Sequence, residues 1–193
     1  MPNEKVDASF TYTTTTTIPM RKKIVIAING IGGTGKDTFC EYCYNMSSGL
    51  NINSISSMDQ IKQIAKDLGW TGSKTTKDRK MLSDLKDLST EYNDGPFNYI
   101  KSRIMKMNSG VLFIHIREIE EIEKVKQFVE NEASFEFMSV RINRNVETAT
   151  NNTGDKGATL DYPYTVEIDN NGTLDELSFK AYEFMKNIKQ KSK

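Results

Sequence analysis

The segment that most constrains this chain is a glycine-rich stretch behind a short apolar run. The apolar run is 24–28, and the stretch reads, in order, Gly30, Ile31, Gly32, Gly33, Thr34, Gly35, Lys36, Asp37 and Thr38. The residues that follow, 39–46, are typical of a helix. A buried strand, a glycine-rich turn with a lysine and a helix form the arrangement of a phosphate-binding loop, or P-loop, whose backbone N–H groups and helix N-terminus attract anions. The alternative is a glycine-rich turn that binds nothing.

The lysine and the residue after it carry most of the chemistry of this stretch. The pattern G-x-x-x-x-G-K runs without a gap from Gly30 to Lys36, and Lys36 is expected to reach the outer phosphates of a nucleotide. The next position normally holds Ser or Thr as a contact for Mg²⁺, but here it is Asp37. Because Mg²⁺ prefers oxygen ligands, we expect Asp37 to hold the ion directly or through water.

Size and charge exclude several classes of protein. A chain of 193 residues is long enough for one domain with a substantial core. Lys plus Arg and Asp plus Glu number 26 each, so no net charge attracts the chain to nucleic acid or to an acidic membrane. We also see no apolar run near the ~18 residues of a membrane span and no signal peptide. The expected location is the cytoplasm, and the expected partners are small molecules.

The two cysteines, Cys40 and Cys43, lie three residues apart on the helix expected after the glycine-rich stretch. A C-x-x-C pair can be redox-active or can form half of a zinc site. His115 is the only histidine and there is no second cysteine pair. The favoured interpretation is therefore two partly buried thiols in a reducing compartment.

Strand and helix patterns alternate along the rest of the chain. The expected strands are 24–29, 51–56, 111–116, 135–142 and 164–168, with amphipathic helices between them. This alternation predicts a three-layer α/β/α fold with a five-stranded parallel sheet. Capping boxes are expected at Ser57 and Thr75, and a similar Thr-x-x-Glu cap at Thr173. Residues 1–20, with five threonines at 13–17, are expected to form a tail or an added edge strand. Residues 21–193 are expected to form the main domain, with a mobile lid around 143–161.

Ligands of open parallel sheets bind at the carboxyl ends of the strands. The glycine-rich stretch follows the first expected strand, Ser57 the second, Arg117 the third and Arg144 the fourth. We therefore expect these four positions at one edge of the sheet. A GTPase is disfavoured because the chain lacks an N-K-x-D motif after a strand. A motor-type ATPase is disfavoured because His115 stands near the place of the strand-ending acid.

A resemblance to a known family is carried by the G-x-x-x-x-G-K-D-T stretch and by four shorter matches in the same order. This P-loop resembles that of phage-type deoxynucleoside monophosphate kinases and of animal phosphomevalonate kinases. The shorter matches are Ser57-Met58-Asp59-Gln60-Ile61-Lys62, Arg79 with Leu82 and Leu85, Arg117 with Glu121, and Asn170-Asn171-Gly172-Thr173-Leu174. Together they cover residues 24 to 188. In that group the third strand ends in an acid before T-R, whereas this chain has His115.

The resemblance implies a nucleoside monophosphate kinase-like protein that moves the γ-phosphoryl of ATP, with Mg²⁺, to a phosphorylated acceptor. In such a protein Gly30 to Gly35 would surround the β-phosphate and Thr38 would contact the inner phosphate. The implied catalytic residues are Lys36, Arg117 and Arg144, the last from a lid. Arg141 is a less certain lid candidate, since it also fits within a strand. The implied acceptor-binding residues are Ser57, Lys62, Arg79, Lys86, Arg117 and Glu121.

Three hypotheses stay open at this stage. The leading one is a kinase for nucleoside or deoxynucleoside monophosphates. The second keeps the chemistry but uses a non-nucleotide phosphorylated metabolite as acceptor. The third is an ATP-binding module without transfer, motivated by His115 and by a lid with few arginines. His115 is expected either to face the acceptor or to pack in the core. The oligomeric state is expected to be monomer or homodimer.

Overall fold

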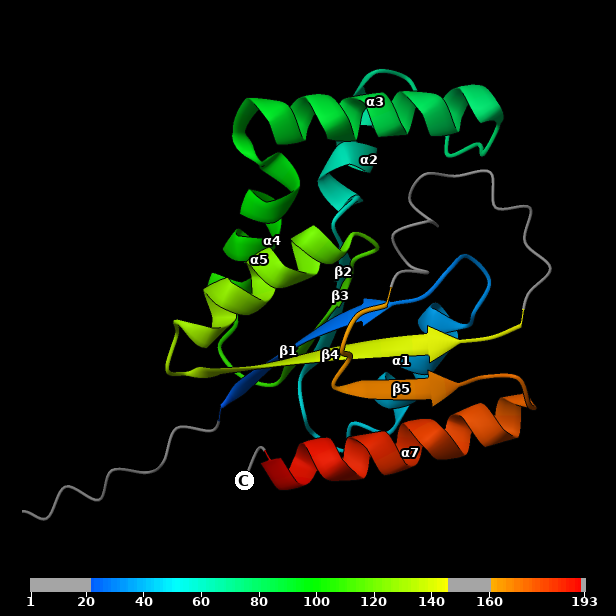
Figure 1. Ribbon diagram of the computed structural model, residues 1–193, viewed down its shortest axis with the longest axis vertical. Helices are drawn as coiled ribbons and strands as arrows, with labels where there is room; N and C mark the ends of the chain where they lie inside the picture. Colours follow the sequence, from blue (N-terminus) through cyan, green and yellow to red (C-terminus); the bar gives the residue numbers. More distant parts are fainter. Residues whose placement is uncertain (1–21, 146–160, 192–193) are drawn as a thin grey trace, which may run out of the picture.

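The computed structural model describes residues 22–145 and 161–191. These residues form one sheet and the helices around it (Figure 1). The strands are β1 (Lys23–Asn29), β2 (Ile52–Ser56), β3 (Val111–His115), β4 (Phe135–Asn143) and β5 (Val166–Asp169). The helices are α1 (Lys36–Asn45), α2 (Asp59–Asp67), α3 (Thr76–Asn93), α4 (Gly95–Met105), α5 (Ile119–Glu130) and α7 (Leu174–Lys191). The residues 1–20 and most of the expected loop at 143–161 lie outside the described part.

The sheet is parallel throughout, with strand order β2-β3-β1-β4-β5, as the alternating pattern predicts. β1 is central, and Ile28 near its end pairs with His115 of β3 and Val140 of β4. From β1 the chain crosses to β2 on one side, and from β3 it crosses back to β4 on the other. The carboxyl ends of β1 and β3 are therefore a topological switch point, where open α/β sheets bind ligands.

Side chains of β1 alternate between two cores, one on each face of the sheet. Ile24, Ile26 and Ile28 pack with buried residues of α1 and α7, while Val25 and Ala27 pack with those of α4 and α5. In Figure 1, α7 lies below the sheet and α4 and α5 lie above it. Burial on both faces explains the continuously apolar sequence of this strand. Within the described residues, no helix has the length and apolar character that crossing a membrane requires.

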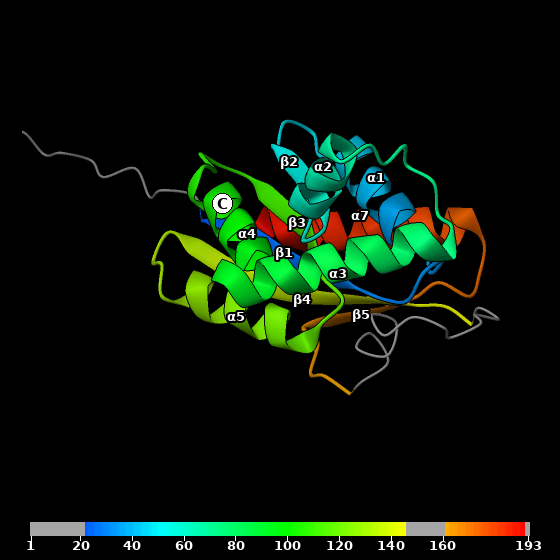
Figure 2. The ribbon, with the colours of Figure 1, turned by 90° about the horizontal axis from the view of Figure 1, so that it is seen from above.

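α3 lies apart from the sheet and packs on α2 and α4 (Figures 1 and 2). It begins as predicted: the Thr75 hydroxyl accepts a hydrogen bond from the Asp78 N–H, and the Asp78 side chain accepts one from the Thr75 N–H. Its predicted apolar face is only partly used, because no residue of α3 is buried and Leu88 is exposed. The reason is that α3 covers other helices and not the sheet.

The predicted capping box at Ser57 is wrong. Ser57 is buried and its N–H donates to the carbonyl of His115, so it extends the pairing of β2 with β3. The helix begins at Asp59 instead, and the Asp59 carboxylate accepts the Ser56 N–H. At the other end of the chain, Thr173 caps α7 as expected by accepting the Glu176 N–H. Leu174, however, is exposed and does not share the buried face of α7.

Candidate functional site

The glycine-rich loop joins the end of β1 to the start of α1, and two of its glycines are required by close packing. Gly30 has φ 143°, and a Cβ there would lie 2.5 Å from the carbonyl oxygen of Ile142. Gly35, with φ 92°, is the N-cap of α1, and a Cβ there would collide with the amide of Asn170. Any side chain at either position would force the loop away from β4 or from the turn before α7. The loop therefore keeps its backbone close to its neighbours at the positive end of α1.

Two buried asparagines hold this loop in place. Asn29 accepts the Gly30 N–H at 2.5 Å, and its Nδ2 donates to the Arg117 carbonyl at 3.2 Å and to the Tyr164 hydroxyl at 2.8 Å. Asn170 donates from Nδ2 to the Thr34 carbonyl at 2.8 Å, and its N–H donates to the Asn143 carbonyl. The loop is thus fixed to the chain that leaves β3, β4 and β5.

Sequence reasoning missed the structural role of these asparagines. The signal for Asn29 was a lone polar residue at the end of an otherwise apolar strand, directly before the first glycine. Asn170 carried only a turn signal, and its contact with Thr34 spans 136 residues of sequence.

Lys36 curves back over the loop that precedes it. Its Nζ donates to the carbonyl oxygens of Gly30 at 2.6 Å and Ile31 at 2.8 Å. The ammonium group therefore lies at the glycine-rich turn, where an anion would meet it together with the N-terminus of α1. Thr38 is half-buried in the first turn of the same helix.

Asp37 and His115 lie next to each other beside the loop. The Asp37 side chain is 98% exposed, and its Oδ1 lies 3.6 Å from His115 Nδ1. On its other side, His115 Nε2 lies 3.0 Å from the Ser54 hydroxyl and 3.9 Å from the Cys40 sulfur. Burial lowers the pKa of His115, although the Asp37 carboxylate opposes the shift. His115 therefore faces α1 and β2 at the edge of the core, close to the loop.

Whether the residues around Asp37 and His115 could hold Mg²⁺ can be judged from the oxygen, nitrogen and sulfur atoms that they offer. Among the described residues, no cluster of three or more His, Cys, Asp and Glu side chains could hold a metal by itself. Mg²⁺ commonly binds through one or two carboxylates together with substrate phosphates and water. The exposed carboxylate of Asp37, adjacent to Lys36, fits that mode. Cys40 and Cys43 are free, as predicted, but both are buried and not partly buried, and burial raises the pKa of Cys43 to about 12.

The predicted arginines occupy different surroundings. Arg117 is exposed two residues after the end of β3, and its backbone carbonyl accepts a hydrogen bond from Asn29. Arg144 is exposed directly after β4, before the part of the loop that lies outside the described residues. Arg141 lies within β4, with its guanidinium 5.7 Å from the centre of the Tyr164 ring. Arg79 is exposed near the start of α3, where its Nε donates to the Lys74 carbonyl.

Lys86 and Glu121 come together, but in an ion-pair cluster between α3 and α5. Lys86 Nζ lies 2.7 Å from Glu118 Oε1 and 3.2 Å from Glu121 Oε1. Glu121 Oε2 is buried without a hydrogen-bond partner among the described residues, and burial raises the pKa of this carboxyl group. Lys62 is half-exposed and lies 4.0 Å from Asp59. The structure therefore gives Lys86 a role in holding α3 to α5.

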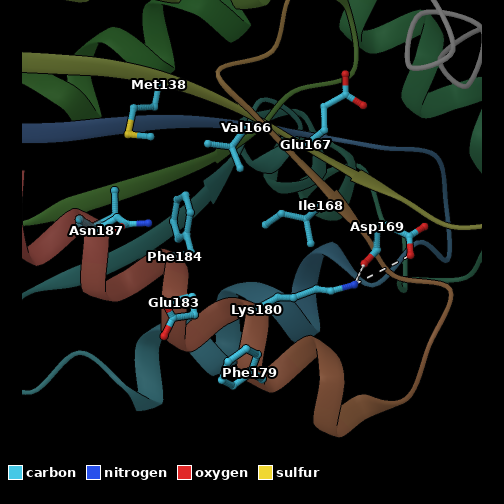
Figure 3. A pocket seen from close by; sticks show the side chains of 11 residues that line it. Met138, Val166, Glu167, Ile168, Asp169, Phe179, Lys180, Glu183, Phe184 and Asn187 are labelled. Atoms are coloured by element: carbon cyan, nitrogen blue, oxygen red, sulfur yellow. Dashed lines mark hydrogen bonds and ion pairs between the residues drawn. The ribbon is translucent and has the colours of Figure 1, made fainter.

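A cavity of about 440 Å³ lies elsewhere, between β5 and α7 (Figure 3). Its walls are largely apolar and include Ile168 and Phe184, and Lys180 forms an ion pair with Asp169 at one side. No residue of the glycine-rich loop lines it. The cavity is therefore separate from the candidate phosphate site.

Comparison with known proteins identifies the fold. No protein-family model matches the sequence, and no curated protein does. Among solved structures, a protein from Chloroflexus aurantiacus with a provisional kinase assignment is 13% identical, with a TM-score of 0.57 over 90% of this chain and all of the other. The hexameric APS kinase from Thiobacillus denitrificans is 14% identical, with a TM-score of 0.51 over 90% of this chain and 30% of the other. The Mycobacterium tuberculosis APS kinase CysC, solved with AMPPNP and APS, is 14% identical, with a TM-score of 0.49 over 87% of this chain and 99% of the other.

The two structures with TM-scores above 0.5 support a P-loop kinase fold, and they do not single out the phage-type deoxynucleoside monophosphate kinases that the sequence resembles. The fold agrees with the parallel sheet, the glycine-rich loop after its central strand and the position of Lys36. The chain has the three-layer α/β/α architecture of P-loop kinases.

Proposed function

We propose that this protein is an ATP-dependent phosphotransferase, and that its acceptor is a nucleoside or deoxynucleoside monophosphate. The observation that carries the proposal is the loop from Gly30 to Lys36 at the switch point of the sheet. Its tight backbone, the N-terminus of α1 and the Lys36 ammonium together form a site for the phosphates of ATP. The P-loop kinase fold supports transfer over binding alone.

The chain's own residues supply positioning and positive charge, which are the main requirements of phosphoryl transfer. Lys36 would contact the outer phosphates, and Thr38 the inner one. Arg117 follows β3 and Arg144 follows β4, the two strands that pair with β1. These arginines would bind the acceptor phosphate and the transferring group, because a guanidinium pairs well with phosphate oxygens. Asp37 would hold Mg²⁺, which neutralises phosphate charge when it is bound.

The acceptor side of the proposal rests on fewer contacts. Ser57 directly follows β2 and Arg117 lies two residues after β3, so both are at the carboxyl ends of their strands. Lys62 lies in α2 and Arg79 in α3, later along the chain that leaves β2. Lys86 and Glu121 support this side by joining α3 to α5. A phosphorylated metabolite that is not a nucleotide would meet the same arginines, and it remains the second candidate acceptor.

The test is ADP formation from ATP against a panel of nucleoside and deoxynucleoside monophosphates, APS and phosphorylated metabolites. We expect turnover that depends on one class of monophosphate and is lost in Lys36→Ala. The matched control is Lys80→Ala, since Lys80 is an exposed lysine of α3 paired with Asp84, and its activity should equal the wild type. Equal ADP release with every acceptor and with none would contradict the proposal. ATP binding by calorimetry without acceptor-dependent turnover would favour a binding module.

A bisubstrate inhibitor separates the two candidate acceptors. Adenosine and thymidine joined by phosphates should bind much more tightly than ATP alone if the acceptor is a nucleotide. Arg117→Ala should raise the KM for the acceptor and lower kcat, while the KM for ATP changes little. A change confined to the KM for ATP would remove Arg117 from the acceptor site.

A further inference from the structure

The His115 ring is held by residues from two elements other than its own strand. Ser54 of β2 lies 3.0 Å from Nε2, and Cys40 of α1 lies 3.9 Å from the same atom. Asp37, in the first turn of α1, lies 3.6 Å from Nδ1. The His115 side chain is only 18% exposed, whereas that of Asp37 is 98% exposed. A fixed ring therefore stands beside a carboxylate that has few other constraints.

The neighbours of the ring decide which nitrogen carries its proton. A hydroxyl and a thiol can both donate hydrogen bonds, and a carboxylate can only accept them. The Cys40 thiol stays protonated because burial raises its pKa. Nε2 thus faces two donors, and its one lone pair suits the Ser54 hydroxyl at 3.0 Å, while Nδ1 faces an acceptor 3.6 Å away. The neutral ring with hydrogen on Nδ1 therefore fits these neighbours better than the other tautomer.

We propose that His115 is a positioning residue, whose Nδ1–H holds one carboxylate oxygen of Asp37 and leaves the other to bind the divalent cation. The proposal rests on the function proposed above, and specifically on Asp37 as the metal-holding residue. An exposed carboxylate side chain loses conformational entropy when it binds an ion. A hydrogen bond from a rigid neighbour holds the side chain beforehand and so reduces that entropy loss. The usual partners of metal-holding groups act in the same way, and their loss weakens metal binding about 10- to 100-fold. In this chain His115, at the end of β3, is the residue that positions the metal-holding carboxylate.

Two amide substitutions separate the roles of the two ring nitrogens. In His115→Asn, the amide nitrogen occupies approximately the place of Nδ1 and can still donate to Asp37. In His115→Gln, the amide lies near the place of Nε2 and keeps the contact with Ser54 instead. The measurement is Mn²⁺ affinity by electron paramagnetic resonance, with the protein saturated by AMPPNP. AMPPNP affinity in the presence of EDTA serves as the metal-free control.

We expect His115→Gln to weaken Mn²⁺ binding about 10-fold. His115→Asn should stay within about threefold of the wild type, and metal-free AMPPNP affinity should be unchanged in both variants. Asp37→Asn should weaken Mn²⁺ binding at least as much, and adding His115→Gln to it should cause little further loss, because the two residues act as one unit. Urea unfolding midpoints of the variants show whether each one is folded.

Three results would overturn the inference. Unchanged Mn²⁺ affinity in His115→Gln would show that the ring does not position Asp37. Equal losses in His115→Asn and His115→Gln would show that the donor at Nδ1 is not what matters. Full additivity of Asp37→Asn and His115→Gln would show independent roles. By contrast, failure of the wild-type protein to bind AMPPNP would refute the proposed function itself, and with it this inference.

Discussion

Asn29 offers the sharpest test of how the glycine-rich loop is held. It is fully buried at the end of β1 and makes three side-chain hydrogen bonds, to the Gly30 N–H, the Arg117 carbonyl and the Tyr164 hydroxyl. Asn29→Ala removes all three and creates only a small cavity. Because Gly30 is also buried, its N–H would be left without a partner.

The expected loss of stability can be worked out from these contacts. Each of the two bonds that Asn29 donates contributes about 0.5–1.5 kcal/mol net, and an unpaired buried N–H costs about 1–3 kcal/mol. The sum is about 2–6 kcal/mol, and relaxation of the loop should keep the loss in the lower half of that range. With a urea m-value of about 2 kcal/mol/M, the unfolding midpoint should fall by about 1–2 M.

The assay is urea unfolding followed by far-UV circular dichroism, together with calorimetric titration of ATP. Asn53→Ala is the matched control, because Asn53 is an exposed asparagine of β2 whose side chain donates a hydrogen bond to Asn51 Oδ1 at 3.2 Å. Its midpoint should change by less than about 0.3 M. Asn29→Ala should also weaken ATP binding, since the glycine-rich loop loses its anchor at Gly30. A midpoint equal to that of Asn53→Ala would refute this account of the loop.

Two further predictions concern the ion-pair cluster and the core. Lys86→Met should destabilise the protein by about 3–5 kcal/mol, because it leaves Glu121 buried without its cation. Burial already raises the pKa of the Glu121 carboxyl group, so more of it is protonated and uncharged at pH 5 than at pH 8. The stability lost in Lys86→Met should therefore be smaller at pH 5 and should grow as the pH rises through that pKa. Urea midpoints that fall equally at pH 5 and pH 8 would contradict this prediction. Phe184→Ala should cost about 3–5 kcal/mol, because Phe184 is buried in the core beside α1. Phe179→Ala on the exposed side of the same helix should cost about 0.5 kcal/mol or less. Equal unfolding midpoints of the two phenylalanine variants would disprove the assignment of these faces.

Much of the fold could be predicted from local patterns. The apolar run of β1 and the alternation of strands with amphipathic helices predict a parallel sheet, because such strands must be covered on both faces. The Thr75 and Thr173 caps were also predictable, since a cap depends on residues three apart. The same rule failed at Ser57, where pairing with His115 across the sheet competes with capping.

In the candidate site, too, some features could be predicted from local sequence and others could not. The spacing of the glycines and Lys36 predicts a phosphate-binding loop, because those residue types have few other uses between a strand and a helix. The sequence gives no indication that Lys86 and Glu121 would pair with each other, since the two residues are 35 positions apart and lie on different helices.

The sequence alone therefore determined the class of fold and the position of the glycine-rich loop, because both follow from periodicity and from short-range geometry. Only the tertiary structure decided what surrounds the loop. Asn29 and Asn170 hold it through contacts across the sheet, and His115 meets Asp37 because β3 lies beside β1. The physical reason is that strand order sets these neighbours, and strand order is not written in any one segment of the chain.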